Sequence, residues 1–187
     1  MIRVETNIRM EKRTCTDKEQ IKKFLSEAQT AFLGLVDDNI PYVIPLNYVF
    51  KEGNFYMHGA NTGRKINIIN HNANACFTIC ENYGTIADPI PANIDTAYMS
   101  VIANGTIELV TDLDEATAAM QEMLNKYVPD YFIAPLSKAH VDKYQSSLGS
   151  KTAVLKLKPV TMTAKVHQGD EQMKYYYGRT VTQDLSR

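Results

Sequence analysis

Three stretches of strand-like sequence follow one another with only brief polar turns between them, and this spacing restricts the fold more than any other feature. The stretches are Ala31–Val36, Pro41–Phe50 and Phe55–His58, and the turns are Asp37–Asn39 and Lys51–Asn54. Strands joined by such short turns form an antiparallel meander. Proline cannot donate to a strand ladder, so the sequence predicts that Pro45 lies at an edge or a bulge.

Further strands are predicted later in the chain, at Ala75–Cys80, Tyr98–Val110 and Thr152–Lys158. Val160–Val166 extends the last of them after a break at Pro159, and Gly105 predicts a bulge or bend. Residues 82–93 contain Gly84 and two prolines and are predicted to be a loop. About six strands with few helices between them favour a mainly β fold, a closed or nearly closed barrel decorated by helices. The βαβ alternation and Gly-rich fingerprint of a Rossmann domain are missing.

Helices are predicted at four places. Thr16–Glu19 has the form of a capping box before an apolar stripe that starts at Ile21. A second helix runs from Thr62 to about Asn72, and a third follows Thr111 and stops before Pro129. Residues 137–148 are predicted to contain a short helix.

Composition indicates a single globular domain. The chain has 187 residues, of which 44% are hydrophobic and 22% charged, and its net charge is −1. This charge disfavours broad nucleic-acid binding. The sequence has no apolar run of the ~20 residues that a membrane span needs, and its N-terminus lacks the apolar core of a signal peptide. We therefore expect a cytoplasmic protein with no nucleic-acid or membrane partner, with an N-terminal arm at 1–15, a main domain at 16–168 and a tail at 169–187.

The cysteines and histidines do not predict a metal site. Cys76 and Cys80 lie four residues apart in a predicted strand, roughly 13 Å from each other, which excludes a disulfide between them. Both are expected to be small core residues. The four histidines are scattered along the sequence, so no structural metal is expected.

Anion binding is predicted where the strand Phe55–His58 leads into the helix that begins near Thr62. Thr62 is the expected helix cap, and Arg64 and Lys65 fall in the first turn. Cations at a helix N-terminus are repelled by the positive end of the helix dipole. A phosphate bound there would attract both the cations and the dipole, so the arrangement would become favourable. The simpler alternative is that both are solvated surface charges.

The surrounding residues exclude some chemistries and leave others open. The spacing of Gly59 and Gly63 is one residue too short for a P-loop, and Ile66 stands where that loop needs Ser or Thr. His58 is either a structural histidine or a ligand-facing one, and Ser100 either meets a ligand or satisfies a core hydrogen bond. None of the serines sits in a nucleophile elbow. An enzyme with so little acid–base apparatus usually takes its chemistry from a cofactor.

Several motifs occur in the order and spacing of a known family: Val43-Ile-Pro-Leu-Asn47, Phe55-Tyr-Met-His-Gly-Ala60, Gly63-Arg-Lys65, Cys76-Phe-Thr-Ile79 and Tyr98-Met-Ser-Val-Ile102. This pattern resembles the flavin-binding split-barrel proteins related to pyridoxamine 5′-phosphate oxidase, and among them the Nim-type nitroimidazole-resistance proteins. The resemblance covers residues 14 to about 165. It implies an FMN-binding, six-stranded antiparallel Greek-key split β-barrel, which forms a homodimer with two flavin sites at the subunit interface.

The resemblance also implies roles for individual residues. Arg64 and Lys65, beside Gly63, would hold the FMN phosphate. Met57 and His58 would flank the ring or the ribityl chain, Ser100 stands where the oxidase strand offers a flavin-binding Gln, and His58 is the candidate catalytic residue. The isoalloxazine would be lined by Val43, Ile44, Pro45, Leu46 and Asn47.

The expected function is that of an FMN-dependent oxidoreductase. Electrons would pass from a reduced nicotinamide or another donor to a small acceptor, such as a nitroaromatic. Residues that bind substrate phosphate in the oxidase are not recognisable in 174–187, which disfavours pyridoxamine-phosphate oxidation. The alternatives are a flavin-binding or storage module without turnover and a barrel that uses haem or a deazaflavin.

Overall fold

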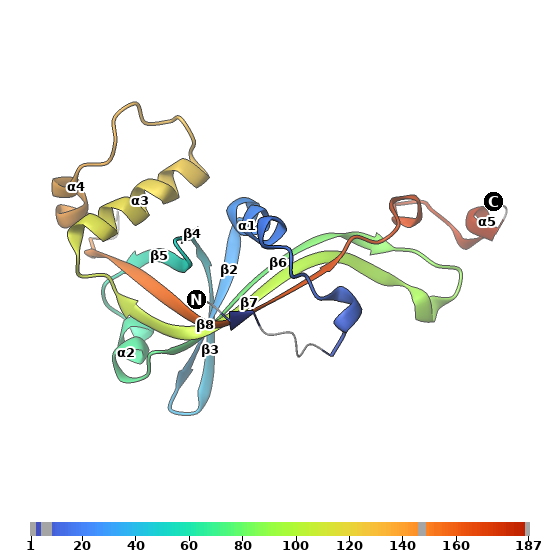
Figure 1. Ribbon diagram of the computed structural model, residues 1–187, viewed down its shortest axis with the longest axis horizontal. Coiled ribbons are helices and arrows are strands. Elements are labelled where there is room, and N and C mark those ends of the chain that lie inside the picture. Colours follow the sequence, from blue (N-terminus) through green and yellow to red (C-terminus); the bar gives the residue numbers. More distant parts are fainter. Residues whose placement is uncertain (1–2, 5–8, 146–148, 186–187) are drawn as a thin grey trace.

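The computed structural model shows a barrel with a long arm that projects from one side (Figure 1). It describes residues 3–4, 9–145 and 149–185. The helices are α1 (Lys18–Glu27), α2 (Arg64–His71), α3 (Leu113–Tyr127), α4 (Lys138–Lys143) and α5 (Val181–Leu185), with short 3₁₀ turns at Glu11–Arg13, Pro91–Asn93 and Glu171–Met173. The strands are β1 (Arg3–Val4), β2 (Thr30–Asp37), β3 (Ile40–Asn47), β4 (Val49–Lys51), β5 (Asn54–Ala60), β6 (Asn74–Ile86), β7 (Asp95–Leu109) and β8 (Thr152–His167).

One sheet contains all eight strands, in the order β3-β2-β6-β7-β8-β5-β4, with β1 added parallel to β8. All other pairings are antiparallel. The predicted mainly β fold is therefore confirmed, with eight strands in place of six. The two additional strands are the short β1 and β4, because Tyr48 interrupts the predicted strand 41–50 and separates β3 from β4.

The sheet curves until its two ends approach each other, which leaves a split between β3 and β5. β3 is an edge strand, so the predicted edge position of Pro45 is confirmed. The core inside the barrel centres on Tyr48, Phe55 and Phe77, whose rings contact one another at centroid distances of 5.1–5.9 Å. All three side chains are fully buried.

Helices cover the barrel from outside. α1 buries Ile21, Phe24 and Leu25 as its period predicts, but its cap is Asp17, not Thr16. The Asp17 carboxylate accepts from the backbone N–H groups of Glu19 and Gln20, so the predicted capping box is wrong. α3 lies over the outer face of β5 and β8.

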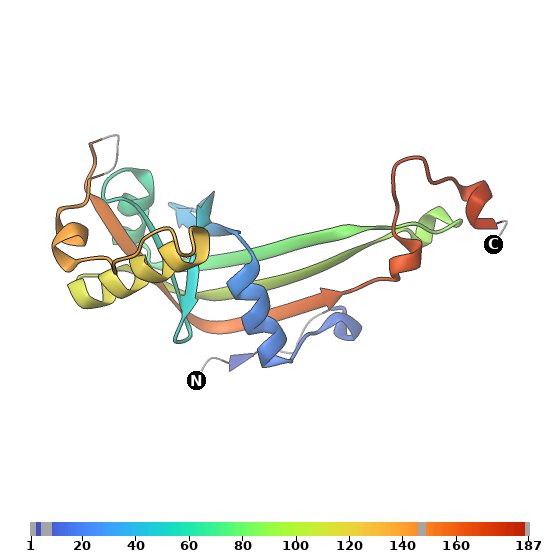
Figure 2. The same ribbon diagram turned by 90° about the horizontal axis from the view of Figure 1, so that it is seen from above.

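The strands β6 and β7 are longer than predicted and build the arm, which points away from α3 and α4 (Figures 1 and 2). They stay paired as far as Ile86 and Asp95, so the predicted loop at 82–93 is wrong over its first half. The predicted bulge at Gly105 is confirmed by a register shift against β8. A Cβ at Gly105 would collide with the carbonyl of Lys158, so no larger residue fits there. β8 continues through Pro159 without the predicted break.

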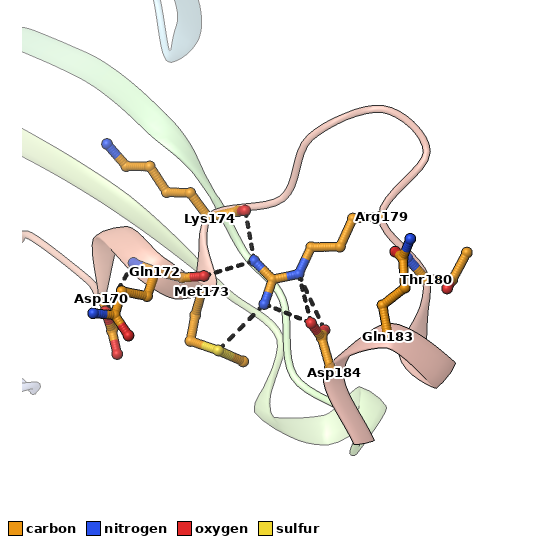
Figure 3. Close-up of polar contacts among 8 residues, drawn as sticks. All are labelled: Asp170, Gln172, Met173, Lys174, Arg179, Thr180, Gln183 and Asp184. Atoms are coloured by element: carbon orange, nitrogen blue, oxygen red, sulfur yellow. Dashed lines mark hydrogen bonds and ion pairs between the residues drawn. The ribbon is translucent and has the colours of Figure 1, made fainter. Parts of the chain in front are cut away.

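The tail after β8 folds back on the tip of the arm. Its backbone pairs with the end of β6, where Ala87 donates to Met173 at 2.8 Å and Tyr175 donates to Thr85 at 2.8 Å. Arg179 is 7% exposed and holds the tail together (Figure 3). Its guanidinium donates to the carbonyls of Gln172 and Lys174 at 2.9 and 2.8 Å and to the carboxylate of Asp184.

The three cysteines are free thiols in different environments. Cys15 is buried, Cys76 is half-buried and Cys80 is exposed, so the prediction that Cys80 is a core residue is wrong. Within the described residues, no cluster of three or more His, Cys, Asp or Glu could hold a metal ion. No helix in that part of the chain has both the length and the apolar character needed to cross a bilayer.

Candidate functional site

A hollow of about 350 Å³ lies in the split of the barrel, between the edge strand β3 and β5. It is lined by Thr30, Pro45, Leu46, Asn47 and His58. The β3 backbone forms one wall, and because β3 is an edge strand, half of its N–H and C=O groups face away from the sheet. A flat polar ligand can hydrogen-bond to such an edge.

His58 forms the opposite wall of this hollow. Its Nδ1 lies 3.1 Å from the sulfur of Met123 on α3. Burial lowers the pKa of His58 below its usual value, and the neighbouring Lys65 ammonium lowers that pKa further. The imidazole is therefore neutral at pH 7. Since Nδ1 faces a weak sulfur acceptor, the Nδ1–H tautomer leaves Nε2 free to accept a proton or a hydrogen bond.

The N-terminus of α2 lies beside the hollow and has no side-chain cap. Gly63 occupies the cap position with φ 98°, so the predicted Thr62 cap is wrong. The left-handed φ suits glycine, which lacks the Cβ that would be strained there. Without a capping side chain, the N–H groups of the first turn stay available to a ligand, and the helix dipole favours an anion.

Two cations from the first turn of α2 stand at this terminus. Arg64 Nε donates to Asp37 Oδ2 at 3.1 Å, and its guanidinium lies 4.6 Å from the centre of the Tyr42 ring. Both side chains of the Arg64–Asp37 pair are well exposed, so the pair contributes at most about 1 kcal/mol. An incoming anion can therefore compete with Asp37 for the guanidinium.

Lys65 turns inward, toward β5. Its Nζ packs closely on Gly59, so that a Cβ at this position would displace the ammonium group. Burial lowers the pKa of Lys65. Among the described residues, no carboxylate lies within ion-pair distance of Lys65 Nζ. A partly buried ammonium without an acidic partner is a favourable position for a bound anion.

The other predicted site residues of β3 and β5 differ in where their side chains lie. Pro45, Leu46 and Asn47 line the hollow, and Ile44 does not; the side chains of Ile44 and Leu46 both pack against the core. Val43 is 59% exposed and lines a different hollow, beside Cys76. Met57 is fully buried in the barrel core, so only its backbone faces the site.

Ser100 lies apart from this hollow, on the outer face of β7 between Cys80 and Lys165 in the strand register. Asn47 belongs to the same row of the sheet through its pairing with Thr30. Three strand spacings separate Asn47 from Ser100, or about 14 Å. The structure therefore does not bring Ser100 to the His58 hollow of its own chain.

Sequence reasoning missed Thr30, Asp37, Tyr42 and Met123 as neighbours of the site. Thr30 was detectable in principle, since it pairs with Asn47 across the first predicted turn. Nothing in the sequence connects Met123 to His58, 65 positions away. The site therefore combines the exposed edge of β3, a neutral His58 and the cationic N-terminus of α2.

These features define a split barrel with a polar hollow at an edge strand, beside a helix N-terminus that carries two cations. The model of the pyridoxamine 5′-phosphate oxidase family matches residues 17–166, so the chain belongs to this family. A comparison with curated protein sequences finds no match.

Solved structures with the same fold include three that cover most of the chain. A flavocytochrome from Azotobacter vinelandii is 20% identical with a TM-score of 0.73, and the match covers 92% of this chain and 84% of that one. A proposed 5-nitroimidazole antibiotic resistance protein from Bacteroides thetaiotaomicron is 25% identical with a TM-score of 0.65, covering 82% and 86%. A protein from Mycobacterium smegmatis that binds FAD and haem is 14% identical with a TM-score of 0.67, covering 93% and 79%.

Proposed function

We propose that this protein is an FMN-dependent oxidoreductase that transfers electrons to a small acceptor. The observation that carries the proposal is Lys65, a partly buried cation with no acidic partner in the part of the chain that the structure describes, next to Arg64 and an uncapped helix N-terminus. Membership of the pyridoxamine 5′-phosphate oxidase family supports a flavin as the phosphorylated ligand. The flavocytochrome and the FAD- and haem-binding protein among the similar structures support the same class.

Each part of the site has a task in this proposal. Arg64, Lys65 and the first turn of α2 bind the phosphate, and the backbone of Pro45–Asn47 orients the ring. When bound, FMN supplies the electron transfer. His58 holds a proton acceptor at Nε2 toward the hollow, and the barrel wall and α3 limit the access of water to it.

A double variant tests the phosphate site. Arg64→Ala/Lys65→Ala removes two charge-assisted contacts, each worth about 1.5 kcal/mol or more, so the Kd for FMN should rise roughly 100-fold. The matched control is Lys22→Ala/Lys23→Ala, which removes two neighbouring exposed cations from α1. Flavin fluorescence quenching measures both affinities. An unchanged Kd in the folded Arg64→Ala/Lys65→Ala protein contradicts the assignment.

A second experiment separates an enzyme from a binding module. Purified protein with FMN is supplied with NADH or NADPH and a nitroaromatic or quinone acceptor, and nicotinamide oxidation is followed. The similar structure of a proposed nitroimidazole resistance protein supports the nitroaromatic acceptor. Turnover that falls about 100-fold or more in His58→Ala, with FMN still bound, supports the catalytic role of this residue. Bound FMN without turnover favours a storage module, and a Soret band or selective deazaflavin binding identifies a different cofactor.

We also propose that the protein is a homodimer whose flavin sites lie at the subunit interface. The outer sheet face around Ser100 exposes Phe32, Val43, Ile102 and Val160, each between 39% and 65%. Such an apolar face on a sheet is typical of a protein interface. With a partner on this face, Ser100 would join the site of the other subunit.

The oligomeric state tests this second proposal. Ile102→Lys places a charge in the centre of the face and should give a monomer with weakened FMN binding. Ile133→Lys is the control, because Ile133 is fully exposed in the loop before α4. Sedimentation equilibrium measures the mass. A wild-type monomer, or an Ile102→Lys protein that stays dimeric, contradicts the proposed interface.

A further inference from the structure

α3 and α4 lie at the end of the molecule opposite the arm (Figure 1). Between them is an apolar cavity of about 410 Å³. Eight of its lining residues are aliphatic, aromatic, methionine or proline: Met120, Leu124, Phe132, Ala134, Pro135, Leu136, Val141 and Val154. The others are Ser137, His140, Tyr144 and Thr152. The volume lies in the range of small-molecule sites, which are likewise mostly apolar with a few polar groups.

A hydrogen bond and an ion pair hold the elements around this cavity together at its rim, and no side chain that the structure describes fills its centre. The Leu136 backbone N–H donates to Gln121 Oε1 at 2.7 Å, and Lys138 forms an ion pair with Asp114. α4 has no fully buried residue, and only Val141 packs against the core. The cavity is open to solvent on one side, where Phe132 and Tyr144 are 56% and 38% exposed, so a small molecule can enter it.

The lining determines the chemistry of that occupant. It contains no Asp, Glu, Lys or Arg, so it offers a charged ligand no ion-pair partner, whereas its apolar side chains favour an uncharged one. Ser137 Oγ already accepts from the backbone of His140 at 3.2 Å. The His140 imidazole and the Tyr144 hydroxyl have no hydrogen-bond partner among the described residues, and their rings lie 5.7 Å apart. They can bond to one oxygen of an otherwise apolar molecule.

The cavity adjoins the His58 hollow. Val154 lines the cavity and pairs directly with His58 across β5 and β8, so both side chains lie on the same face of the sheet. Met120 and Leu124 lie on α3 on either side of Met123, whose sulfur contacts His58. A ligand in the cavity would therefore touch residues that are direct neighbours of His58 and of Met123, the residue that His58 contacts.

We propose that this cavity is a second ligand site, for an uncharged aromatic molecule of two or three fused rings with a carbonyl or phenolic oxygen. A cavity of about 150 Å³ holds benzene, so 410 Å³ has room for such a ring system. Phe132 and Tyr144 offer ring faces for stacking, and His140 and Tyr144 bind the oxygen. This site does not require flavin and goes beyond the proposed function.

The test uses 2-naphthol as the probe, with the full chain. The chain contains no tryptophan, so naphthol fluorescence is read without tryptophan emission. We expect saturable binding with one site per chain. Val141→Phe and Ala134→Phe fill the cavity and should each weaken binding at least tenfold, whereas Ala139→Phe, on an exposed position of α4 outside the lining, should not. His140→Leu should weaken 2-naphthol several-fold and leave naphthalene unchanged.

Two further measurements separate this site from the flavin site. Excess FMN should not displace 2-naphthol, and Arg64→Ala/Lys65→Ala should bind it like the wild type, even if FMN binding fails. Absence of saturable binding, displacement by FMN, or wild-type affinity in Ala134→Phe would overturn the proposal. Ala134 lies in an exposed loop, so this variant decides the matter if Val141→Phe does not fold.

Discussion

At the scale of single residues, Lys126 is the least expected side chain of the protein. It lies on α3, where the helical stripe predicts only a polar surface position. In the structure its Nζ stands 3.8 Å from the centre of the Tyr48 ring and donates to the carbonyl of Leu25 at 3.1 Å. Burial lowers the pKa of Lys126 to about 8. The charged form is therefore held in the protein at a cost in stability.

This lowered pKa predicts a rise in stability with pH. Between pH 8 and 10.5 the folded protein has released the Lys126 proton while the unfolded chain, with its ordinary pKa of 10.5, still binds it. The free energy of unfolding therefore rises across this window. Lys126→Met should be more stable than wild type by about 1 kcal/mol at pH 7.5, after allowance for solvent screening, and the difference should be much smaller at pH 10.

Urea unfolding at both pH values measures this difference. The control is Lys22→Met, on the exposed side of α1, which should show no pH-dependent gap. A gap that persists unchanged at pH 10 means that the lysine titrates normally in the folded protein. The carbonyl of Leu25 keeps a partner in Lys126→Met, because the Tyr48 hydroxyl also donates to it at 3.0 Å.

Sequence reasoning located the residues of the site better than their contacts. His58 and Lys65 were predicted together because they lie seven positions apart at one strand-to-helix junction, and the structure brings them together. The cap was misassigned because Thr62 and Gly63 are both acceptable cap residues, and only the backbone dihedrals distinguish them. Met123 could not be predicted, since its contact depends on how α3 packs on β5.

At the scale of elements, the tail shows how one side chain can organise a segment with little core. Arg179 uses its guanidinium to bind two backbone carbonyls and the Asp184 carboxylate, which ties the turn at Glu171–Met173 to α5 (Figure 3). The sequence predicts only a tail at 169–187 outside the main domain, because no periodic pattern in it indicates a folded segment. A single arginine near a run of tyrosines does not predict that its side chain will hold the segment together.

Arg179→Ala should therefore release the tail and leave the barrel intact. It leaves two carbonyls and a carboxylate without their donor, which lowers the local stability of this segment. Limited proteolysis should then cleave after Lys174 at least tenfold faster, followed by mass spectrometry. Gln172→Ala is the control, because only the backbone carbonyl of Gln172 takes part. Equal cleavage rates in wild type and Arg179→Ala would contradict this role.

The arm strands were mispredicted for a related reason. Gly84, Pro89 and Pro91 are strong turn signals, yet β6 continues past Gly84 because β7 offers a partner as far as Asp95. Tertiary pairing overrides local propensity in such strands. The bulge at Gly105 was predicted correctly because a glycine inside a strand indicates a position where a Cβ does not fit. In the structure, the Lys158 backbone approaches Gly105 too closely for a Cβ.

At the scale of the whole molecule, the barrel and the arm differ in how well they are buried. The barrel encloses an aromatic core, whereas the arm exposes large apolar side chains on both its hairpin and its tail: Tyr83, Ile90, Ile94, Tyr175, Tyr176, Tyr177, Val181 and Leu185. A segment with so few buried contacts opens locally unless another surface covers it. In the proposed dimer, the partner subunit provides that cover.

Hydrogen exchange at two protein concentrations tests this expectation. Amides of residues 82–98 should become at least tenfold more protected when the concentration is raised through the dimer Kd, since association stabilises only what it covers or orders. Amides of β5 inside the barrel are the internal control and should not change. Arm protection that is independent of concentration would show that the partner does not cover the arm.

The position of β8 has a consequence for the order in which the chain can fold. β8 is an interior strand of the sheet and pairs with β1, β5 and β7, yet among the strands of the described residues it is the last to be synthesised. Until residue 167 has left the ribosome, β5 is paired only with β4, and β7 only with β6. Each of them therefore keeps one unpaired edge. The nascent protein therefore closes its barrel only after β8 has emerged, and until then its exposed strand edges are where a chaperone would bind.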